Sequence, residues 1–399
     1  MPRLVHERAK LFTKSLHAFT VLWQTFSRRM KHLLEMLKII EGGLSSDRAK
    51  VLAYGDQLAA KLASEGEARA AEALRRVLSA STPRHASAAG VAPSLPVDGE
   101  SRMPLADVVF VKRGDAPVIL PRGTSAEVAE FLSHIRCSDL LLAGGVSLSP
   151  SMLMFGPPGC GKTQLAKHIA SELELPLVTA RADSLISSYL GSTAKNLRLL
   201  FEHARNRPCV LFLDEFDSVA KLRDDRHELG ELKRVVVSLL QNLDALDNST
   251  IVIAATNHEH LLDTAIWRRF GYRLRVTLPD TEARRQLAEL FLADQRPEDA
   301  PLELIAEITD GLSGADLRAI CEDARRIALL GRRERVDGAE LLRRIAKYRV
   351  PSLHALPVPE QLRRVRALDP KLYTIRRLSE MFGVSTGKVS NLLREGSDQ

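Results

Sequence analysis

An apolar run that passes directly into a glycine-rich turn constrains this chain more than any other feature of its sequence. Residues 152–155 read Met-Leu-Met-Phe, and residues 156–163 read GPPGCGKT. The closely spaced glycines allow backbone angles that turn several N–H groups toward one point. The positive end of a following helix would add to the attraction for an anion. The sequence therefore predicts a buried strand, a phosphate-binding turn and a helix in succession.

The turn predicts a nucleoside triphosphate as its ligand. Lys162 supplies a cation for the terminal phosphates, and the Thr163 hydroxyl is placed to bind Mg²⁺. We therefore expect ATP and Mg²⁺ as cofactors. The residues of this segment expected to contact ATP are Gly156, Pro157, Pro158, Gly159, Cys160, Gly161, Lys162, Thr163 and Gln164.

A second apolar run ends in paired carboxylates, in the sequence CVLFLDEFD at 209–217. Beside a phosphate-binding turn, Asp214 is suited to hold Mg²⁺ and to contact the nucleotide. Glu215 is suited to polarise the attacking water. Asp217 is as readily a structural residue as a site residue. The pair predicts ATP hydrolysis, with Glu215 catalytic.

Two further segments carry candidate catalytic residues. Asn257 follows the apolar run 251–255 and would orient water near the γ-phosphate. Arg268 and Arg269 are adjacent in the sequence LDTAIWRRF at 262–270. Two arginines in such a place are either surface charge or a pair that reaches the active site of a neighbouring subunit. In the second case, the site is complete only in an assembly.

Short β-like runs alternate with helical runs through the middle of the chain. This alternation predicts a parallel sheet with helices on both faces, the α/β fold of P-loop NTPases, followed by an α-helical lid. The expected strands are 152–155, 177–179, 210–213, 251–255 and 274–277, and 283–348 is expected to be helical.

The ends of the chain differ in composition from its middle. Residues from about 11 to 78 have helical periodicity, which we expect Gly42-Gly43 to interrupt. Residues 79–103 are rich in Ser, Ala, Pro and Gly, as in a flexible linker. The expected domains are a helical N-terminal domain (1–80), a linker (81–103), the nucleotide-binding domain (104–280), a lid (281–350) and a C-terminal unit (360–399).

The order of these motifs resembles the AAA group of the AAA+ ATPases over about residues 105–350. The resemblance implies that Asn257 is the sensor residue and that Arg268 and Arg269 occupy the arginine-finger region. Many members separate the two arginines by two residues, so which one is the finger stays open. The sequence GLSGADL at 311–317 resembles the lid motif of the group. By this resemblance, Gly314 and Ala315 approach the nucleotide base.

The same resemblance implies a homo-oligomer, a hexameric ring, with a loop lining its central pore. The segment SYLGS at 188–192 resembles that loop, so Tyr189, Leu190 and Gly191 are expected to grip an extended polypeptide. The alternative without a functional role is that Tyr189 is an ordinary half-buried aromatic residue. The charged stretch 221–231 is either a second pore loop or a solvated loop. More narrowly, the helical N-terminus and the DEFD and WRRF segments resemble bacterial single-ring AAA ATPases paired with a subtilisin-like protease.

Residues 373–394 read as two short helices joined by a tight turn at Gly383, similar to a helix-turn-helix unit. Lys388, Asn391 and Arg394 would face outward from the second helix. DNA is therefore a possible partner through 373–394, and a protein-contacting helical hairpin is the alternative. The formal net charge of +7 permits nucleic acid but also a solvated basic surface.

The four cysteines are scattered without CxxC spacing, which argues against a disulfide scaffold or a zinc site. Cys160 lies inside the turn, which predicts sensitivity to thiol modification if it is exposed. No apolar run approaches the length of a membrane span, and no secretory signal is visible. We therefore expect a soluble, cytoplasmic protein with no membrane partner.

Two functional hypotheses follow from these patterns. The first is an ATPase that acts as a ring oligomer and couples hydrolysis to remodelling of a protein or protein–nucleic acid substrate. The second is an ATP-switched DNA-binding regulator that acts through the C-terminal unit.

Overall fold

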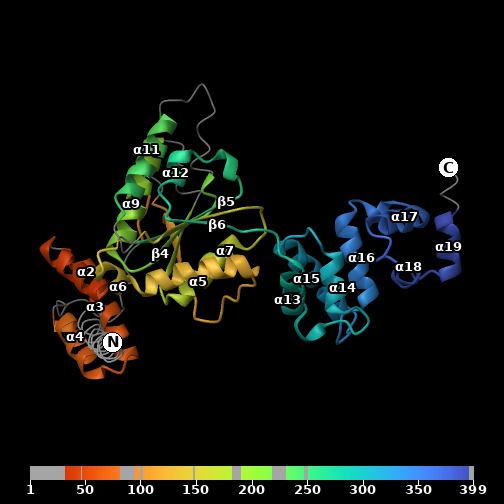
Figure 1. The fold of residues 1–399 in the computed structure, drawn as a ribbon, viewed down its shortest axis with the longest axis horizontal. Coiled ribbons are helices and arrows are strands. Elements are labelled where there is room, and N and C mark those ends of the chain that lie inside the picture. Colours follow the sequence, from red (N-terminus) through yellow and green to blue (C-terminus); the bar gives the residue numbers. More distant parts are fainter. Residues whose placement is uncertain are drawn as a thin grey trace, which may run out of the picture. The chain divides into compact units, whose positions relative to one another are not determined.

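A computed structural model describes residues 32–45, 47–80, 95–98, 102–146, 149–181, 190–217, 231–246 and 250–394. The chain forms two compact units (Figure 1). The first takes its residues from 1–116, 127–155 and 163–274, and the second from 117–126, 156–162 and 275–399. Within the described ranges, no helix is both long and apolar enough to cross a membrane.

The first unit is built on a six-stranded sheet with the order β1-β3-β4-β5-β2-β6. Its strands are β1 (Ala106–Val109), β2 (Ser151–Phe155), β3 (Leu177–Ala180), β4 (Val210–Leu213), β5 (Ile251–Thr256) and β6 (Tyr272–Arg275). Strands β3, β4, β5 and β2 pair in parallel, which confirms the predicted parallel sheet. Strand β1 pairs antiparallel with β3 and was not predicted. The last strand begins at Tyr272, earlier than the expected 274.

Helices cover both faces of this sheet (Figure 1). Strand β5 is buried at every residue, as a central strand covered on both faces must be. On one face, Val252 and Ala254 share a core with Leu200 of α9 and Leu239 of α11. The helices around the sheet are α5 (Arg122–Arg136), α6 (Ser138–Ala143), α7 (Lys162–Glu172), α9 (Leu190–Asn206), α11 (Glu231–Asp244) and α12 (Thr264–Trp267), with a 3₁₀ turn at Glu259–Leu261.

Three N-terminal helices belong to the same unit: α2 (Leu33–Leu44), α3 (Arg48–Ser64) and α4 (Ala68–Ala80). The expected interruption at Gly42-Gly43 was wrong, because α2 continues to Leu44. A Cβ on Gly42 would lie 2.9 Å from Val51 Cγ2. Gly42 therefore allows α2 to approach α3 closely, and it does not end the helix.

The second unit contains helices α13 (Thr281–Leu292), α14 (Leu302–Ile308), α15 (Gly314–Leu330), α16 (Gly338–Arg349), α17 (Val358–Leu368), α18 (Ile375–Phe382) and α19 (Thr386–Arg394), with 3₁₀ turns at Ala293–Gln295 and Leu353–Ala355. One hydrophobic core joins α13–α16 to α17–α19. Its members include Leu341 and Ile345 of α16 and Leu378 and Val389 of α18 and α19. The lid helices and the C-terminal helices are therefore packed as one body.

Candidate active site

The glycine-rich turn has the backbone that its sequence predicts. Gly156, Gly159 and Gly161 all have positive φ, at 141°, 73° and 89°. A Cβ on Gly156 would lie 2.1 Å from the carbonyl oxygen of Val276, so no other residue fits there. Pro157 and Pro158 are exposed at the tip of the turn.

Lys162 is buried, and its ammonium group is directed back onto the turn. Its Nζ donates to the carbonyl oxygens of Gly156 and Pro157, both at 2.8 Å. A buried ammonium group needs such acceptors to offset its desolvation. Phosphate oxygens, which carry full negative charge, would be stronger acceptors for the same group.

Thr163 and Asp214 come together in the first unit, as the sequence predicts for two ligands of one cation. The Thr163 hydroxyl donates to Asp214 Oδ2 at 2.8 Å. Thr163 lies in the first turn of α7, and Asp214 directly follows β4. A hydroxyl oxygen and a carboxylate are hard oxygen donors of the type that Mg²⁺ prefers. Gln164, the next residue of α7, is exposed.

Glu215 follows Asp214 in an unusual backbone conformation. Its φ is 47°, in the left-handed region that residues other than glycine rarely adopt. Its N–H donates to Asp214 Oδ1 at 3.0 Å, and its own side chain is exposed. Such a conformation persists only where its surroundings enforce it, and it is concentrated at functional sites. The Glu215 carboxylate is thus presented to solvent at the carboxyl end of β4.

Asn257 directly follows β5 and is half-buried. Strands β4 and β5 are parallel neighbours, so Asn257 and Asp214 lie at the same edge of the sheet. Asp217 has a structural contact at this edge, because its Oδ1 accepts a hydrogen bond from Thr256 Oγ1 at 2.8 Å. Asn257, in contrast, has no hydrogen bond to another described residue.

The two arginines after α12 differ sharply in their surroundings. Arg269 is held within its own unit: its Nε and Nη2 donate to the two carboxylate oxygens of Asp244 at 2.8 and 3.1 Å. Its Nη1 also donates to the carbonyl oxygen of Ala265 at 3.1 Å. Arg268 is exposed, and its guanidinium group forms no hydrogen bond or ion pair with another described residue. Arg268 is therefore the one available to another molecule.

In the second unit, the lid motif contacts the glycine-rich turn directly. The Ala315 N–H donates to the carbonyl oxygen of Gly159 at 3.0 Å. A Cβ on Gly159 would lie 2.6 Å from Ser313 Oγ, so the missing side chain makes room for the lid. Gly314 lies beside the same carbonyl, since its own Cβ would be 3.5 Å from Gly159 O. Gly314 and Ala315 therefore both lie beside the glycine-rich turn, and their approach to the nucleotide base stays a prediction.

Other predictions fall partly on residues that the structure does not describe. Tyr189 and the stretch 218–230 lie outside the described residues, while Leu190 and Gly191 open α9. No sequence pattern indicates the Asp244 contact that separates Arg269 from Arg268. The same holds for Tyr348, whose hydroxyl donates to the carboxylate of Asp316 in the lid motif.

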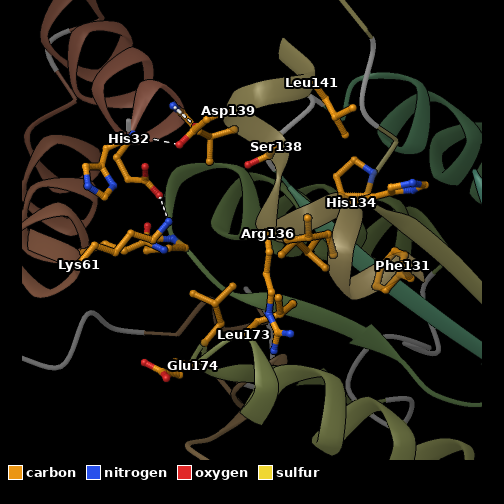
Figure 2. A pocket seen from close by; sticks show the side chains of 18 of the residues that line it. His32, Lys61, Phe131, His134, Arg136, Ser138, Asp139, Leu141, Leu173 and Glu174 are labelled. Carbon is orange, nitrogen blue, oxygen red and sulfur yellow. Dashed lines mark hydrogen bonds and ion pairs between the residues drawn. The ribbon is translucent and has the colours of Figure 1, made fainter. Parts of the chain in front are cut away.

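A cavity of about 640 Å³ lies elsewhere in the first unit, between helices α2–α3 and α5–α6. His32 and Lys61 face Arg136 and Asp139 across it (Figure 2). Asp139 accepts hydrogen bonds from the N–H groups of His32 and Leu34, at 2.9 and 3.0 Å, and so caps α2. The cavity is lined by residues at the amino ends of β4 and β5. It is therefore at the opposite edge of the sheet from Asp214 and Asn257.

Comparison with known proteins agrees with this geometry. Residues 152–278 match the ATPase family associated with various cellular activities (AAA), and residues 299–342 match the AAA+ lid domain. An uncharacterised AAA family ATPase of Sinorhizobium fredii is 37% identical over 273 residues, which cover 67% of this chain and 81% of that protein.

Archaeal proteins also resemble the chain over a shorter stretch. The proteasome-activating nucleotidase of Pyrococcus furiosus is 37% identical over 210 residues, or 51% of this chain and 53% of the relative. That of Methanopyrus kandleri is 35% identical over 209 residues, or 50% and 48%. The chain thus spans about half the length of these nucleotidases.

Proposed function

This chain belongs to the AAA family of ATPases, and we propose that it uses ATP hydrolysis to remodel a protein substrate as a ring oligomer. That it is an ATP-hydrolysing enzyme follows from the family itself. The main support for the roles that we assign to individual residues is the hydrogen bond between Thr163 and Asp214, next to the strained backbone of Glu215.

In this proposal, the turn 156–162 binds the phosphates of ATP and Lys162 exchanges its backbone acceptors for phosphate oxygens. Thr163 and Asp214 hold Mg²⁺, which when bound neutralises phosphate charge. Glu215 accepts a proton from the attacking water, and Asn257 orients that water. The exposed position of Glu215 supports these roles, and so does the Asn257 amide, which has no hydrogen bond to another described residue.

The proposed oligomer rests on Arg268. An exposed guanidinium group with no hydrogen bond or ion pair to a described residue of its own chain is available to stabilise the phosphoryl group in a neighbouring active site. Arg269 instead binds Asp244, which holds α11 against the segment that carries Arg268. We therefore propose Arg268 as the arginine finger and Arg269 as the residue that positions it.

A mixing experiment tests this shared site. Glu215→Gln and Arg268→Ala proteins should each bind ATP but hydrolyse it at least about a hundredfold more slowly than the wild type. In a random ring of both variants, about a quarter of the interfaces combine an intact Glu215 with an intact Arg268. Mixing should therefore restore part of the activity. A mixture as inactive as its components would refute the shared site. Arg269→Ala mixed with Glu215→Gln should also regain activity, because Arg269 positions the Arg268 of its own subunit.

Protein remodelling is supported by the similarity to proteins named proteasome-activating nucleotidases. We propose that Tyr189, Leu190 and Gly191 contact the polypeptide, and that a subtilisin-like protease is a partner that receives it. Tyr189→Ala should keep basal ATP hydrolysis while the unfolding of a tagged fluorescent protein is lost. Unfolding at the wild-type rate would remove the pore-loop proposal but leave the ATPase assignment intact.

One observation favours a second function, DNA binding by the C-terminal helices. Helices α17, α18 and α19 pack together, with Val389 fully buried on the inner face of α19. Lys388, Asn391 and Arg394 are all exposed on its outer face. Residues 358–394 contain eight Lys and Arg against three Asp and Glu. An exposed basic helix on a small helical support is the arrangement that helix-turn-helix proteins place in the major groove.

Point substitutions test DNA binding without disturbing the helical packing. Lys388→Ala and Arg394→Ala should each weaken binding to duplex DNA and reduce its salt dependence by roughly one phosphate contact. Lys347→Ala, which removes an exposed cation of α16, is the matched control. Equal binding by all four proteins in a salt titration would exclude α19 as the DNA-binding element.

A further inference from the structure

The start of α15 is fixed by an unusually complete set of hydrogen bonds. Ser313 caps the helix, and its hydroxyl accepts from the Asp316 N–H at 3.2 Å. Asp316 returns the contact, because its Oδ2 accepts from the Ser313 N–H at 2.9 Å and from the Ser313 hydroxyl at 2.7 Å. This reciprocal capping box fixes the first turn of the helix.

Tyr348 adds a contact from a different helix. It lies in the last turn of α16, and its hydroxyl donates to Asp316 Oδ1, the carboxylate oxygen that the capping box leaves free. Burial alone would raise the pKa of Asp316, but the hydrogen bonds from Tyr348 and Ser313 lower it. The carboxylate therefore stays ionised and accepts a strong, charge-assisted hydrogen bond. Tyr348 is nevertheless an exposed residue, with 47% of its surface accessible to solvent.

The element that Tyr348 holds is the one that contacts the glycine-rich turn. Between Ser313 and Asp316 lies Ala315, whose N–H donates to the Gly159 carbonyl oxygen at 3.0 Å. Ser313 Oγ occupies the space where a side chain of Gly159 would lie. A displacement of the first turn of α15 would therefore change the peptide that joins Gly159 to Cys160.

We propose that Tyr348 is a positioning residue for the nucleotide site: through Asp316 it holds the first turn of α15 against Gly159 and keeps the turn in its ATP-binding conformation. The inference rests on the assignment of ATP to the turn 156–162. Tyr348 does not touch the nucleotide in this proposal. Its effect is on ATP affinity, since it acts on the loop that binds ATP and not on Glu215 or the attacking water.

Cys160 provides a reporter inside the turn that needs no nucleotide. Its thiol is half-buried, whereas Cys137 in the first unit is exposed and the other two cysteines are buried. Alkylation by iodoacetamide, followed at each cysteine by mass spectrometry, gives the rate at Cys160 relative to Cys137. Loss of the Tyr348 contact should expose Cys160 more often and raise this ratio.

The experiment compares full-length wild type, Tyr348→Phe and the control Lys347→Gln, which changes the preceding exposed residue of α16. Tyr348→Phe should raise the relative alkylation rate of Cys160 and the KM for ATP, each roughly three- to tenfold, with kcat changed less than about twofold. Lys347→Gln should match the wild type. Wild-type values of both quantities in Tyr348→Phe would overturn the proposal, and so would a change in one of them alone.

A second variant separates this contact from general loss of structure. Asp316→Asn keeps the size of the side chain but removes the charge that Tyr348 binds. It should raise the same two quantities, and adding Tyr348→Phe to it should raise them no further. Additive effects would mean that Tyr348 acts by another route and would overturn the proposal. Alkylation is measured without nucleotide and does not depend on ATP binding. If Tyr348→Phe changes the alkylation rate of Cys160 but the wild type does not bind ATP, the result counts against the assignment of ATP to the turn 156–162.

Discussion

Replacing Gly159 with alanine should destabilise the second unit more than the same replacement at Gly161, two residues away. Both glycines have positive φ, at 73° and 89°, where a Cβ costs roughly 1–2 kcal/mol. Only at Gly159 would the new Cβ meet the lid, at 2.6 Å from Ser313 Oγ and 3.0 Å from Ala315 Cβ. At Gly161 no atom of a neighbouring element in the described part of the chain lies within 4 Å of such a Cβ.

The contact of the new Cβ with Ser313 determines how much more Gly159→Ala lowers the free energy of unfolding than Gly161→Ala does. To make room, Ser313 must leave its capping position, and losing a serine N-cap costs about 0.5–2 kcal/mol. We therefore expect Gly159→Ala to lower the free energy of unfolding by about 2–4 kcal/mol and Gly161→Ala by about 1–2 kcal/mol. Urea unfolding without nucleotide measures both. Adding Ser313→Gly should recover part of the loss in Gly159→Ala but none in Gly161→Ala.

Equal destabilisation by the two alanine variants would refute this reasoning, because backbone strain alone would then account for both. It would mean that the lid does not contact the turn in the nucleotide-free protein. The role proposed for Tyr348 would lose its physical basis at the same time, since Tyr348 acts through that contact.

Two titratable groups give predictions of pH dependence. Burial raises the pKa of the Cys160 thiol; the charge of Lys162 opposes this rise and that of Asp316 adds to it. The thiolate is therefore scarce at neutral pH, and the alkylation rate of Cys160 should still increase with pH at pH 9. Rate measurements from pH 7 to 10 test this. Burial, with a smaller effect of Arg207, lowers the pKa of His203 from 6.5 to about 4. The unfolded chain then binds the proton first, so stability should fall as pH drops from about 6.5 to 4, by roughly 1–2 kcal/mol after allowing for partial solvent exposure. Urea unfolding of His203→Gln across this range should lack that part of the loss.

The central strands were predictable because their burial leaves a direct trace in the sequence. Strands covered on both faces need continuous apolar runs, and 210–213 and 251–255 have them. Strand β1 has no such trace: only its first residue is buried, and backbone pairing with β3 holds it in place. Gly42 was misinterpreted for a related reason. A glycine that ends a helix and one that lets two helices approach look alike until the neighbouring helix is known.

The contacts of the candidate site also differ in whether the sequence predicts them. Asp214 and Asn257 follow apolar runs, and parallel strands bring their carboxyl ends to one edge, so their proximity could be argued from the sequence. The pairs Arg269–Asp244 and Tyr348–Asp316 join residues 25 and 32 positions apart in different elements: Arg269 follows α12 and Asp244 ends α11, while Tyr348 and Asp316 lie on α16 and α15. Nothing in local spacing specifies such contacts, because they depend on how whole helices pack. The first contact distinguishes Arg269 from Arg268. The second connects α16, through the start of α15, to the glycine-rich turn.

Packing also decides how the DNA hypothesis must be tested. Deleting residues 361–399 would remove α18 and α19 and most of α17, which share one core with the lid. Leu341 and Ile345 of α16, now fully buried, would be exposed to water. Arg343 would lose the Met381 carbonyl that its Nε contacts at 2.6 Å.

Exposing even two large aliphatic side chains of this core costs about 3–6 kcal/mol, comparable with the whole stability of a small domain. Loss of DNA binding in the truncated protein would then report a damaged lid as readily as a missing DNA-binding helix. Lys388→Ala and Arg394→Ala avoid this ambiguity, because both side chains are exposed. The shared core also connects the two functional hypotheses. Since α19 is carried on the lid body, any movement of the lid on ATP binding or hydrolysis moves α19 with it, and DNA affinity through α19 should then depend on the bound nucleotide.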